Sequence, residues 1–188
     1  MKQRIIYGAT VIGSATGLVA SFLETVEYQT LLRNQHAALA CNLNGVLSCS
    51  RVLEAWQSKV FGFPNSMLCI AMFAAMLGIA LVGFSGGIVT AKLRLWLQGI
   101  TLFFLGFGTW FMWESTFRIR ALCILCMFCL SGLLLLNWAW LRLNAPTLPI
   151  SRSWRERLSR AIDHGADIFV WMMYAVLMAA MMFIHFRG

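Results

Sequence analysis

Residues 120–141, RALCILCMFCLSGLLLLNWAWL, form a long apolar run that carries no charge after Arg120. Cysteines recur at every third position at its head, as Cys123, Cys126 and Cys129. A helix needs about 20 apolar residues to cross roughly 30 Å of hydrocarbon, and a backbone in lipid must satisfy its own hydrogen bonds. The stretch therefore predicts a transmembrane helix, placed at about 117–141, with thiols at its first turns.

Four further apolar runs of similar length accompany this one. The 188-residue chain is 60% hydrophobic, whereas roughly half of the residues in a soluble domain are apolar. The predicted spans cover residues 5–28, 66–84, 95–113, 117–141 and 168–185. We therefore expect an all-α integral membrane protein of one domain, 1–188. Its parts are four spans within 1–142 with an outer loop at 33–65, a basic cytoplasmic loop at 143–165 and a fifth span at 166–188.

Basic residues predict the orientation, because Lys and Arg favour the cytoplasmic side. With the N-terminus inside, the inner segments hold nine Lys and Arg residues and the outer segments hold six. The net charge of +8 then reflects topology and contact with anionic lipid, and does not indicate nucleic-acid binding. A signal peptide cleaved at Ala38-Leu39-Ala40 is disfavoured, because the first apolar run is too long for one.

The pair Cys123-x-x-Cys126 has the spacing of a redox-active dithiol. Residues i and i+3 are neighbours on a helix, and the N–H groups at a helix N-terminus carry partial positive charge. Arg118 and Arg120 add to that charge. These effects favour the thiolate, which is the reactive form of cysteine. The alternative is a pair of small residues packed between helices.

Two other cysteines, Cys69 and Cys129, are predicted to be packing residues. Cys129 extends the pair to C-x-x-C-x-x-C, which is similar to part of an iron–sulfur site, but a continuous helix spreads its three thiols around its circumference. Cys69 lies near the outer end of its span and could contact the site.

The outer loop holds the second thiol pair, Cys41 and Cys49, on the side where disulfides persist in a bacterial envelope or endoplasmic reticulum lumen. The turn formers Asn42, Asn44 and Gly45 allow the segment to bend and bring the two together. The next residues predict a short amphipathic helix with Ser50 as its N-cap and an apolar face of Val52, Leu53, Trp56 and Val60. It would be a membrane-surface anchor or a lid over a pocket between the spans.

Two thiol pairs on one side of a helical bundle suggest an electron relay. The loop pair, predicted to face water through Cys41, would exchange with a soluble dithiol. The inner pair would pass electrons to an acceptor in the lipid, where quinones are the common two-electron acceptors.

Four motifs share an order and spacing: Cys41, Cys49-Ser50-Arg51-Val52, Pro64-Asn65-Ser66 and Cys123-Ile124-Leu125-Cys126. They resemble the vitamin K epoxide reductase family in its bacterial form, over roughly residues 1–142. The resemblance implies a four-helix bundle that surrounds a quinone pocket, and a fifth span is common in bacterial members.

The resemblance also implies a role for each residue. Cys126 would contact the quinone, Cys123 would be its disulfide partner, Cys49 would shuttle electrons to Cys123, and Cys41 would meet a thioredoxin-fold (DsbA-like) thiol protein. Asn65 would hydrogen-bond a quinone oxygen, or else be an ordinary helix cap. Menaquinone or ubiquinone is the expected acceptor, in a bacterial inner membrane with the site facing the periplasm or outside. The thiol partner is expected to be a separate protein.

Two positions depart from the family pattern. Ala55 stands where a Ser or Thr is usual, and Leu130 stands where animal members have Tyr. The second quinone hydrogen bond is therefore in doubt, and quinone reduction is favoured over epoxide reduction.

Two other kinds of protein use thiols in a similar setting. An unrelated family of quinone-linked thiol oxidases also has two cysteine pairs, but in the reverse order. A membrane scaffold or metal-binding subunit would use Cys41, Cys49, Cys123 and Cys126 as a structural zinc site of four cysteines. Asp163, His164 and Asp167 are interpreted as a solvated helix start and not as metal ligands.

Overall fold

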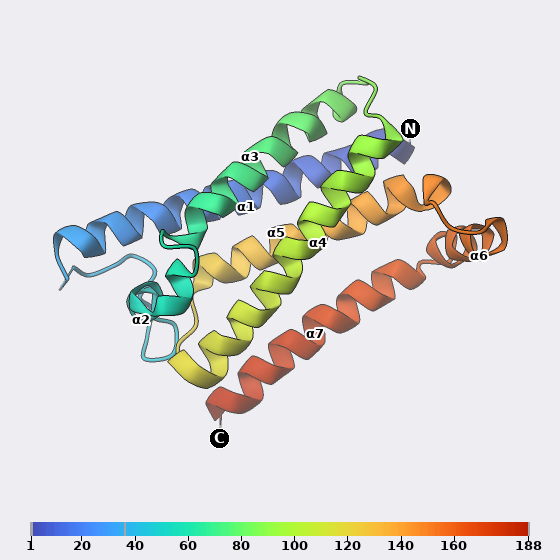
Figure 1. Cartoon of the computed structure of the whole chain (residues 1–188). Helices are drawn as coiled ribbons and strands as arrows, with labels where there is room; N and C mark the ends of the chain where they lie inside the picture. Colours follow the sequence, from blue (N-terminus) through green and yellow to red (C-terminus); the bar gives the residue numbers. More distant parts are fainter. Residues whose placement is uncertain (1, 36, 188) are drawn as a thin grey trace.

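The computed structural model describes residues 2–35 and 37–187. Five long helices dominate it: α1 (Lys2–Arg33), α3 (Asn65–Phe84), α4 (Ala91–Glu114), α5 (Ile124–Asn144) and α7 (Ala166–Arg187). Each is long and apolar enough to cross a membrane. The shorter elements are α2 (Cys49–Glu54), η1 (Trp56–Lys59), η2 (Ser115–Ile119), η3 (Ala145–Thr147) and α6 (Arg152–Asp163). The prediction of an all-α membrane protein is confirmed (Figure 1).

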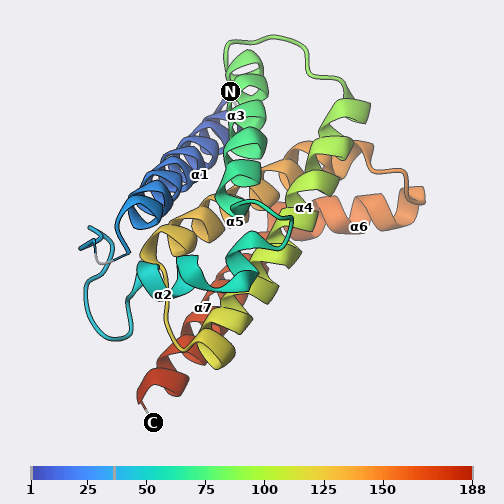
Figure 2. The ribbon, with the colours of Figure 1, turned by 60° about the vertical axis from the view of Figure 1, so that its left-hand side comes forward.

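The bundle is built around α1, which packs against both α3 and α5, while α4 packs against α5. Helix α7 runs beside them and is largely exposed along its length (Figure 1). Helix α2, the connection between α4 and α5, and the end of α7 lie at one end of the bundle. The chain start, the α3–α4 loop and α6 lie toward the other (Figure 2). Both predicted thiol pairs therefore belong to the same end.

The contact between α1 and α5 depends on glycine. Gly13 and Gly17 are four residues apart on α1, a spacing that lets two helix backbones approach closely in a membrane. Gly132 faces them from α5: a Cβ built on it would lie 2.6 Å from the Gly13 carbonyl oxygen. These two helices also carry the residues of the inner site, so their separation controls its geometry.

The boundary between the third and fourth spans differs from the prediction. The fourth span was expected to begin near Phe117, but α4 continues into the π-helical turn η2 and α5 begins at Ile124. Arg120 has a φ of 55°, and a residue in this left-handed conformation commonly ends a helix. Arg118 therefore belongs to the preceding helical segment η2, and only Arg120 lies in the connection to α5.

The basic segment 143–165 was expected to be a loop, but most of it is helical, as η3 and α6. The interpretation of Asp167 as solvated is wrong, because it is buried and forms an ion pair with Arg142, with 2.9 Å between Nη2 and Oδ1. Asp163 and His164 are exposed as predicted, but they end α6 and do not start a helix. The ion pair joins α5 to the start of α7.

Candidate active site

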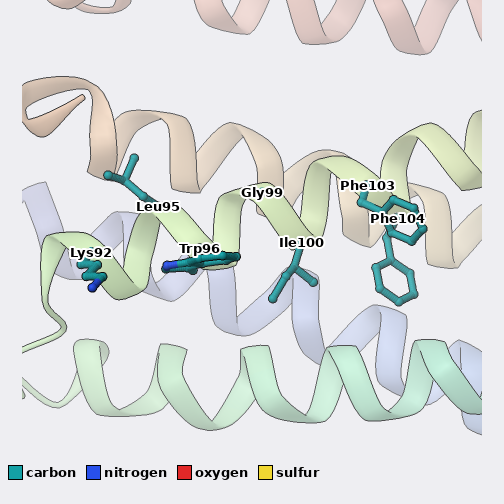
Figure 3. A pocket seen from close by; sticks show the side chains of 7 residues that line it. All are labelled: Lys92, Leu95, Trp96, Gly99, Ile100, Phe103 and Phe104. Atoms are coloured by element: carbon teal, nitrogen blue, oxygen red, sulfur yellow. The ribbon is translucent and has the colours of Figure 1, made fainter. Parts of the chain in front are cut away.

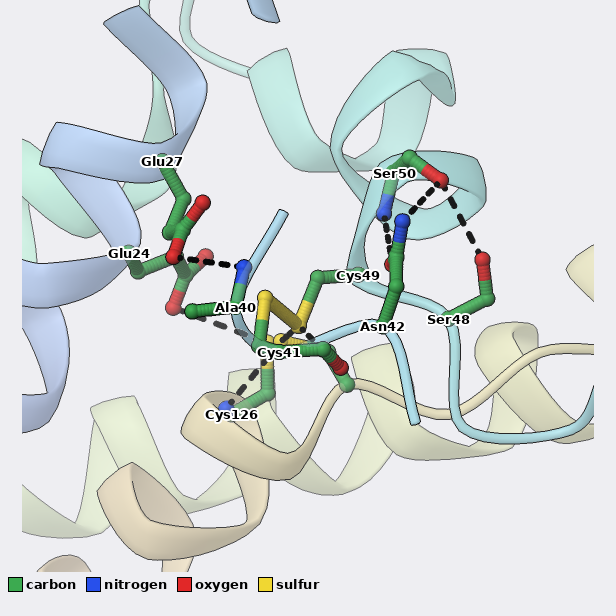
Figure 4. Close-up of a disulfide and its surroundings, with 10 residues drawn as sticks. Glu24, Glu27, Ala40, Cys41, Asn42, Ser48, Cys49, Ser50 and Cys126 are labelled. Atoms are coloured by element: carbon green, nitrogen blue, oxygen red, sulfur yellow. Dashed lines mark hydrogen bonds between the residues drawn. A yellow bond between two sulfur atoms is a disulfide. The ribbon is translucent and has the colours of Figure 1, made fainter. Parts of the chain in front are cut away.

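The loop pair is closed as a disulfide between Cys41 and Cys49, whose Cα atoms are 5.8 Å apart (Figure 4). The Asn42 side chain stabilises this turn: its Oδ1 accepts from the Ser50 N–H and its Nδ2 donates to the Ser50 Oγ, both at 3.1 Å. The turn formers thus bring the two cysteines together, as predicted. Cys41 is only 6% exposed, so it faces water less than predicted, although more than the fully buried Cys49. It belongs to a buried apolar cluster with Tyr28 and Leu31 of α1.

The loop is fastened to the connection between α4 and α5 by one parallel β-bridge, between Leu47 and Leu122. The Leu122 N–H donates to the Val46 carbonyl at 2.8 Å, and the Ser48 N–H donates to the Leu122 carbonyl at 3.0 Å. The next residue on the Leu122 side is Cys123, and Cys49 follows Ser48. The bridge therefore sets the two thiol pairs side by side.

Cys49 and Cys123 are the junction between the pairs. Their Sγ atoms lie 3.3 Å apart, and both residues are fully buried. Thiol–disulfide exchange needs direct contact between an attacking sulfur and the sulfur that it attacks. The arrangement is thus suited to exchange between loop and inner pair with little rearrangement.

Cys123 is the N-cap of α5, and its Sγ accepts from the Cys126 N–H at 3.5 Å. The prediction that the pair lies at a helix N-terminus is confirmed, although Cys123 precedes the first turn and is not within it. Among cysteines of the described chain, Cys69, Cys123, Cys126 and Cys129 are free thiols. In this arrangement the loop pair is bonded and the inner pair has free sulfurs.

Cys126 lines a small, partly enclosed cavity of about 60 Å³. Its wall is mostly apolar and is built from α1, α3, α4 and α5: Glu24, Asn65, Ser66, Cys69, Phe104, Phe107, Gly108, Phe111, Cys126, Cys129, Leu130 and Leu133. An apolar wall with a few polar groups is typical of small-molecule sites. Three aromatic rings from α4, those of Phe104, Phe107 and Phe111, form much of the apolar part of this wall.

Cys69 and Cys129 also belong to this wall, so packing between helices describes only part of their surroundings. The Cys129 Sγ lies 3.2 Å from the Ser21 Oγ on α1 and donates to the Gly17 carbonyl at 3.7 Å. Cys129 thus has polar partners on α1 as well as a place in the cavity wall.

Asn65 is the first residue of α3 and belongs to the wall of the cavity. Its Nδ2 donates to the Gln57 carbonyl at 2.7 Å, while its buried Oδ1 has no hydrogen-bond partner among the described residues. The N-cap position is held by Pro64, so Asn65 is not an ordinary cap. A buried amide oxygen without a partner is costly, so Asn65 is a candidate ligand-binding residue.

The segment after Cys49 differs from the predicted single amphipathic helix. Ser48 is the N-cap in place of Ser50, and α2 ends because the Ala55 backbone is extended. The break changes the helical phase, so Gln57 is buried while Trp56 is 65% exposed. Gln57 bonds both Asn65 and Glu114, the latter from Nε2 to Oε2 at 2.9 Å. Together α2 and η1 cover the thiol end of the bundle (Figure 2).

Glu24 is a site residue that the sequence reasoning missed. It lies on α1, is 8% exposed, and its Oε2 accepts from the Cys126 Sγ at 3.6 Å (Figure 4). One possible metal-ligand atom from each of Glu24, Cys123 and Cys126 lies within 4.8 Å of the others. An acid inside an apolar span was the available signal, because such residues are costly in a membrane and usually functional.

A second hollow lies on the outside of α4 and contains no thiol. Its lining residues are Lys92, Leu95, Trp96, Gly99, Ile100, Phe103 and Phe104 (Figure 3). All come from one helix, and all but Lys92 and Gly99 are large apolar residues. Phe104 also lines the thiol cavity, so an apolar wall continues from the cavity to this membrane-facing groove.

Fold and site together define a helical membrane protein with a buried thiol–disulfide centre beside an apolar cavity. The vitamin K epoxide reductase family model matches residues 9–141, more than half of the chain. The chain belongs to this family. Membership makes the protein an oxidoreductase of a generally quinone-linked family. No curated relative matches the chain.

Proposed function

We propose that the protein is a membrane thiol oxidase that takes electrons from a separate thioredoxin-fold partner, passes them to a membrane quinone and so supports disulfide bond formation. The observation that carries the proposal is the 3.3 Å between the Cys49 and Cys123 Sγ atoms. It connects the loop disulfide to the inner dithiol, whose second member, Cys126, opens onto the cavity.

The thiol steps follow from which sulfur can be reached. A partner thiolate attacks Cys41 in the Cys41–Cys49 disulfide and releases the Cys49 thiolate. Cys49 then attacks Cys123 in an inner disulfide, and Cys126 leaves as a thiolate. The second partner thiol resolves the partner–Cys41 adduct, and Cys41 displaces Cys123 from Cys49. The partner ends oxidised, the loop disulfide is restored and both inner cysteines are reduced.

The cavity residues fit a quinone ring. A bound quinone would supply the two-electron acceptor, whose oxygens take up the two protons of the dithiol. Asn65 offers an amide N–H to a carbonyl oxygen and an unpartnered Oδ1 to a hydroxyl. Phe104, Phe107 and Phe111 exclude water beside Cys126. Leu130 has no hydrogen-bonding group, which favours quinone reduction over epoxide reduction.

The proposed orientation places the thiol end toward the periplasm or outside of a bacterial inner membrane and the N-terminus in the cytoplasm. The basic helix α6 supports it, because Arg152, Arg155, Arg157 and Arg160 lie toward the end of the bundle opposite the thiols (Figure 2).

The central experiment is quinone reduction by the purified protein, driven by a reduced thioredoxin-fold donor. A donor that lacks its second cysteine cannot resolve its adduct, so the mixed disulfide should accumulate and can be mapped by mass spectrometry. We expect it on Cys41, because Cys41 is 6% exposed and Cys49 is fully buried. The adduct should disappear in Cys41→Ser and persist in the control Cys69→Ser. An adduct mainly on Cys49 or Cys123 would contradict the proposed order.

Metal binding is a second candidate function, favoured by the close approach of Glu24, Cys123 and Cys126. The expected four-cysteine zinc site is not assembled, since Cys41 and Cys49 are joined in a disulfide. Purification without reductant distinguishes the two functions. The relay predicts disulfides and no stoichiometric metal, whereas a metal site predicts bound zinc and free inner thiols.

A further inference from the structure

Glu24 is a buried carboxyl group that the thiol steps above leave unused. It is the one acidic residue in the wall of the cavity, and that wall contains no Lys, Arg or His. The ion pairs found among the described residues do not include it. The ionisable groups that face it are thiols, from Cys69 on α3 and from Cys126 and Cys129 on α5. A structural ion pair therefore does not account for its position.

Its position matches the need for a proton carrier. Oxidation of the inner pair breaks the S–H bonds of Cys123 and Cys126, forms one S–S bond and transfers two electrons and two protons to the acceptor, where two O–H bonds form. The Cys126 thiol already donates to the Glu24 Oε2 at 3.6 Å, and the carboxyl group lines the cavity. The other polar side chains of the wall are an amide, a hydroxyl and thiols, and only Glu24 can hold an additional proton on oxygen.

We infer that Glu24 is a catalytic residue that takes the proton of the Cys126 thiol as the inner disulfide forms and delivers it to a quinone oxygen. The inference rests on the proposed function, since it names a further group for the same reaction. It also accounts for the presence of an acid in the apolar first span. A charged residue is costly in a membrane helix, and such residues usually have a function.

Glu24→Gln is the decisive variant, because the amide keeps the shape and can still accept a hydrogen bond from Cys126 but cannot carry its proton. Loss of a positioned proton carrier typically costs 10²–10⁴-fold, so we expect quinone reduction to slow by about a hundredfold or more. Exchange between the loop and inner pairs should stay at the unmodified rate. The matched control is Glu27→Gln, one turn further along α1, where the carboxylate accepts from the Ala40 N–H and does not line the cavity.

A second readout needs no quinone. Infrared difference spectra between the dithiol and disulfide states, set with soluble thiol reagents, should contain a carboxyl signal because Glu24 loses the Cys126 donor. The signal should vanish in Glu24→Gln, persist in Glu27→Gln and shift in frequency in Glu24→Asp. If Glu24→Gln does not fold, the Glu24→Asp spectrum decides, since an unchanged signal assigns it to another group.

The outcomes separate the two proposals. A wild-type protein that exchanges thiols but reduces no quinone contradicts the proposed function. A wild-type protein that reduces quinone, with Glu24→Gln within about threefold of it, overturns the role of Glu24 and leaves the relay intact. Slower quinone reduction together with equally slow thiol exchange would mean that Glu24 holds the structure, and would also overturn the inference.

Discussion

Adding one methyl group at Gly132 should separate the two helices that form the inner site. The new Cβ would lie 2.6 Å from the Gly13 carbonyl oxygen, and ordinary contact begins at 3.4 Å. The atoms that the new Cβ would meet all belong to the backbone, so rotation of a side chain cannot relieve the clash. Helices α1 and α5 must therefore move apart by the difference, about 0.8 Å.

This displacement has two measurable consequences. Overpacking of a close contact costs roughly 1–3 kcal/mol of stability. Gly132 is six residues from Cys126 along α5, so the displacement reaches the thiol end. The Glu24–Cys126 contact, 3.6 Å in the structure, would lengthen to about 4.4 Å and no longer be a hydrogen bond. Since a misplacement of about 1 Å can cost 10²-fold in rate, quinone reduction should fall roughly tenfold to a hundredfold.

Gly132→Ala is tested against Gly78→Ala, a glycine of α3 whose added Cβ would meet nothing within 4 Å. Thermal unfolding in detergent and donor-driven quinone reduction are measured for both. Gly78→Ala should be as active as the unmodified protein and no less stable, because Ala is the better helix former. Equal stability and rate in the two variants would refute the reasoning that the glycine contact sets the geometry of the site.

Further predictions concern other parts of the bundle. Cys126→Ala should abolish quinone reduction, because no other free thiol among the described residues lies beside Cys123 at the cavity, while Cys129→Ala should keep most of it; equal loss in both would reassign the active pair. Asn65→Ala should slow quinone reduction by about tenfold or more through loss of a hydrogen bond that strengthens as charge develops, with loop exchange unchanged. Asp167→Ala should lower the free energy of unfolding by about 1–3 kcal/mol, because it leaves a partly buried guanidinium unpaired, with Asp163→Ala near neutral as its control in denaturant titrations.

The spans could be predicted from the sequence because the bilayer fixes the length of an apolar run. The error at 117–123 arose from a local backbone event, the left-handed Arg120, that hydrophobicity does not report. The Cys41–Cys49 disulfide was also within reach, because turn formers lie between the two residues. The sequence did not predict which side chains after Cys49 point inward, because the extended backbone of one residue, Ala55, turns Gln57 inward.

The inner site depends on contacts that a single sequence does not reveal. Glu24 is visible as an acid in an apolar run, but which side of α1 it occupies relative to Cys126 follows from the glycine contact between α1 and α5. The Leu47–Leu122 bridge is one residue pair long and joins segments far apart in the chain, so it has no periodic pattern to detect. Both are products of tertiary packing.

The surroundings of the four cysteines differ from one step of the proposed route to the next. Cys41 keeps a small exposure, Cys49 and Cys123 have none, and Cys126 lines the cavity. Because exchange requires direct contact between sulfurs, a soluble disulfide or thiol that cannot reach Cys123 cannot equilibrate with the inner pair except through the loop. The bridge at Leu122 therefore does more than hold Cys49 near Cys123, since it also excludes other reactants from that sulfur. On the proposed route, electrons that enter at Cys41 would have one neighbouring sulfur to pass to at each step, and the dithiol beside the cavity would pass them to an acceptor that enters from the membrane.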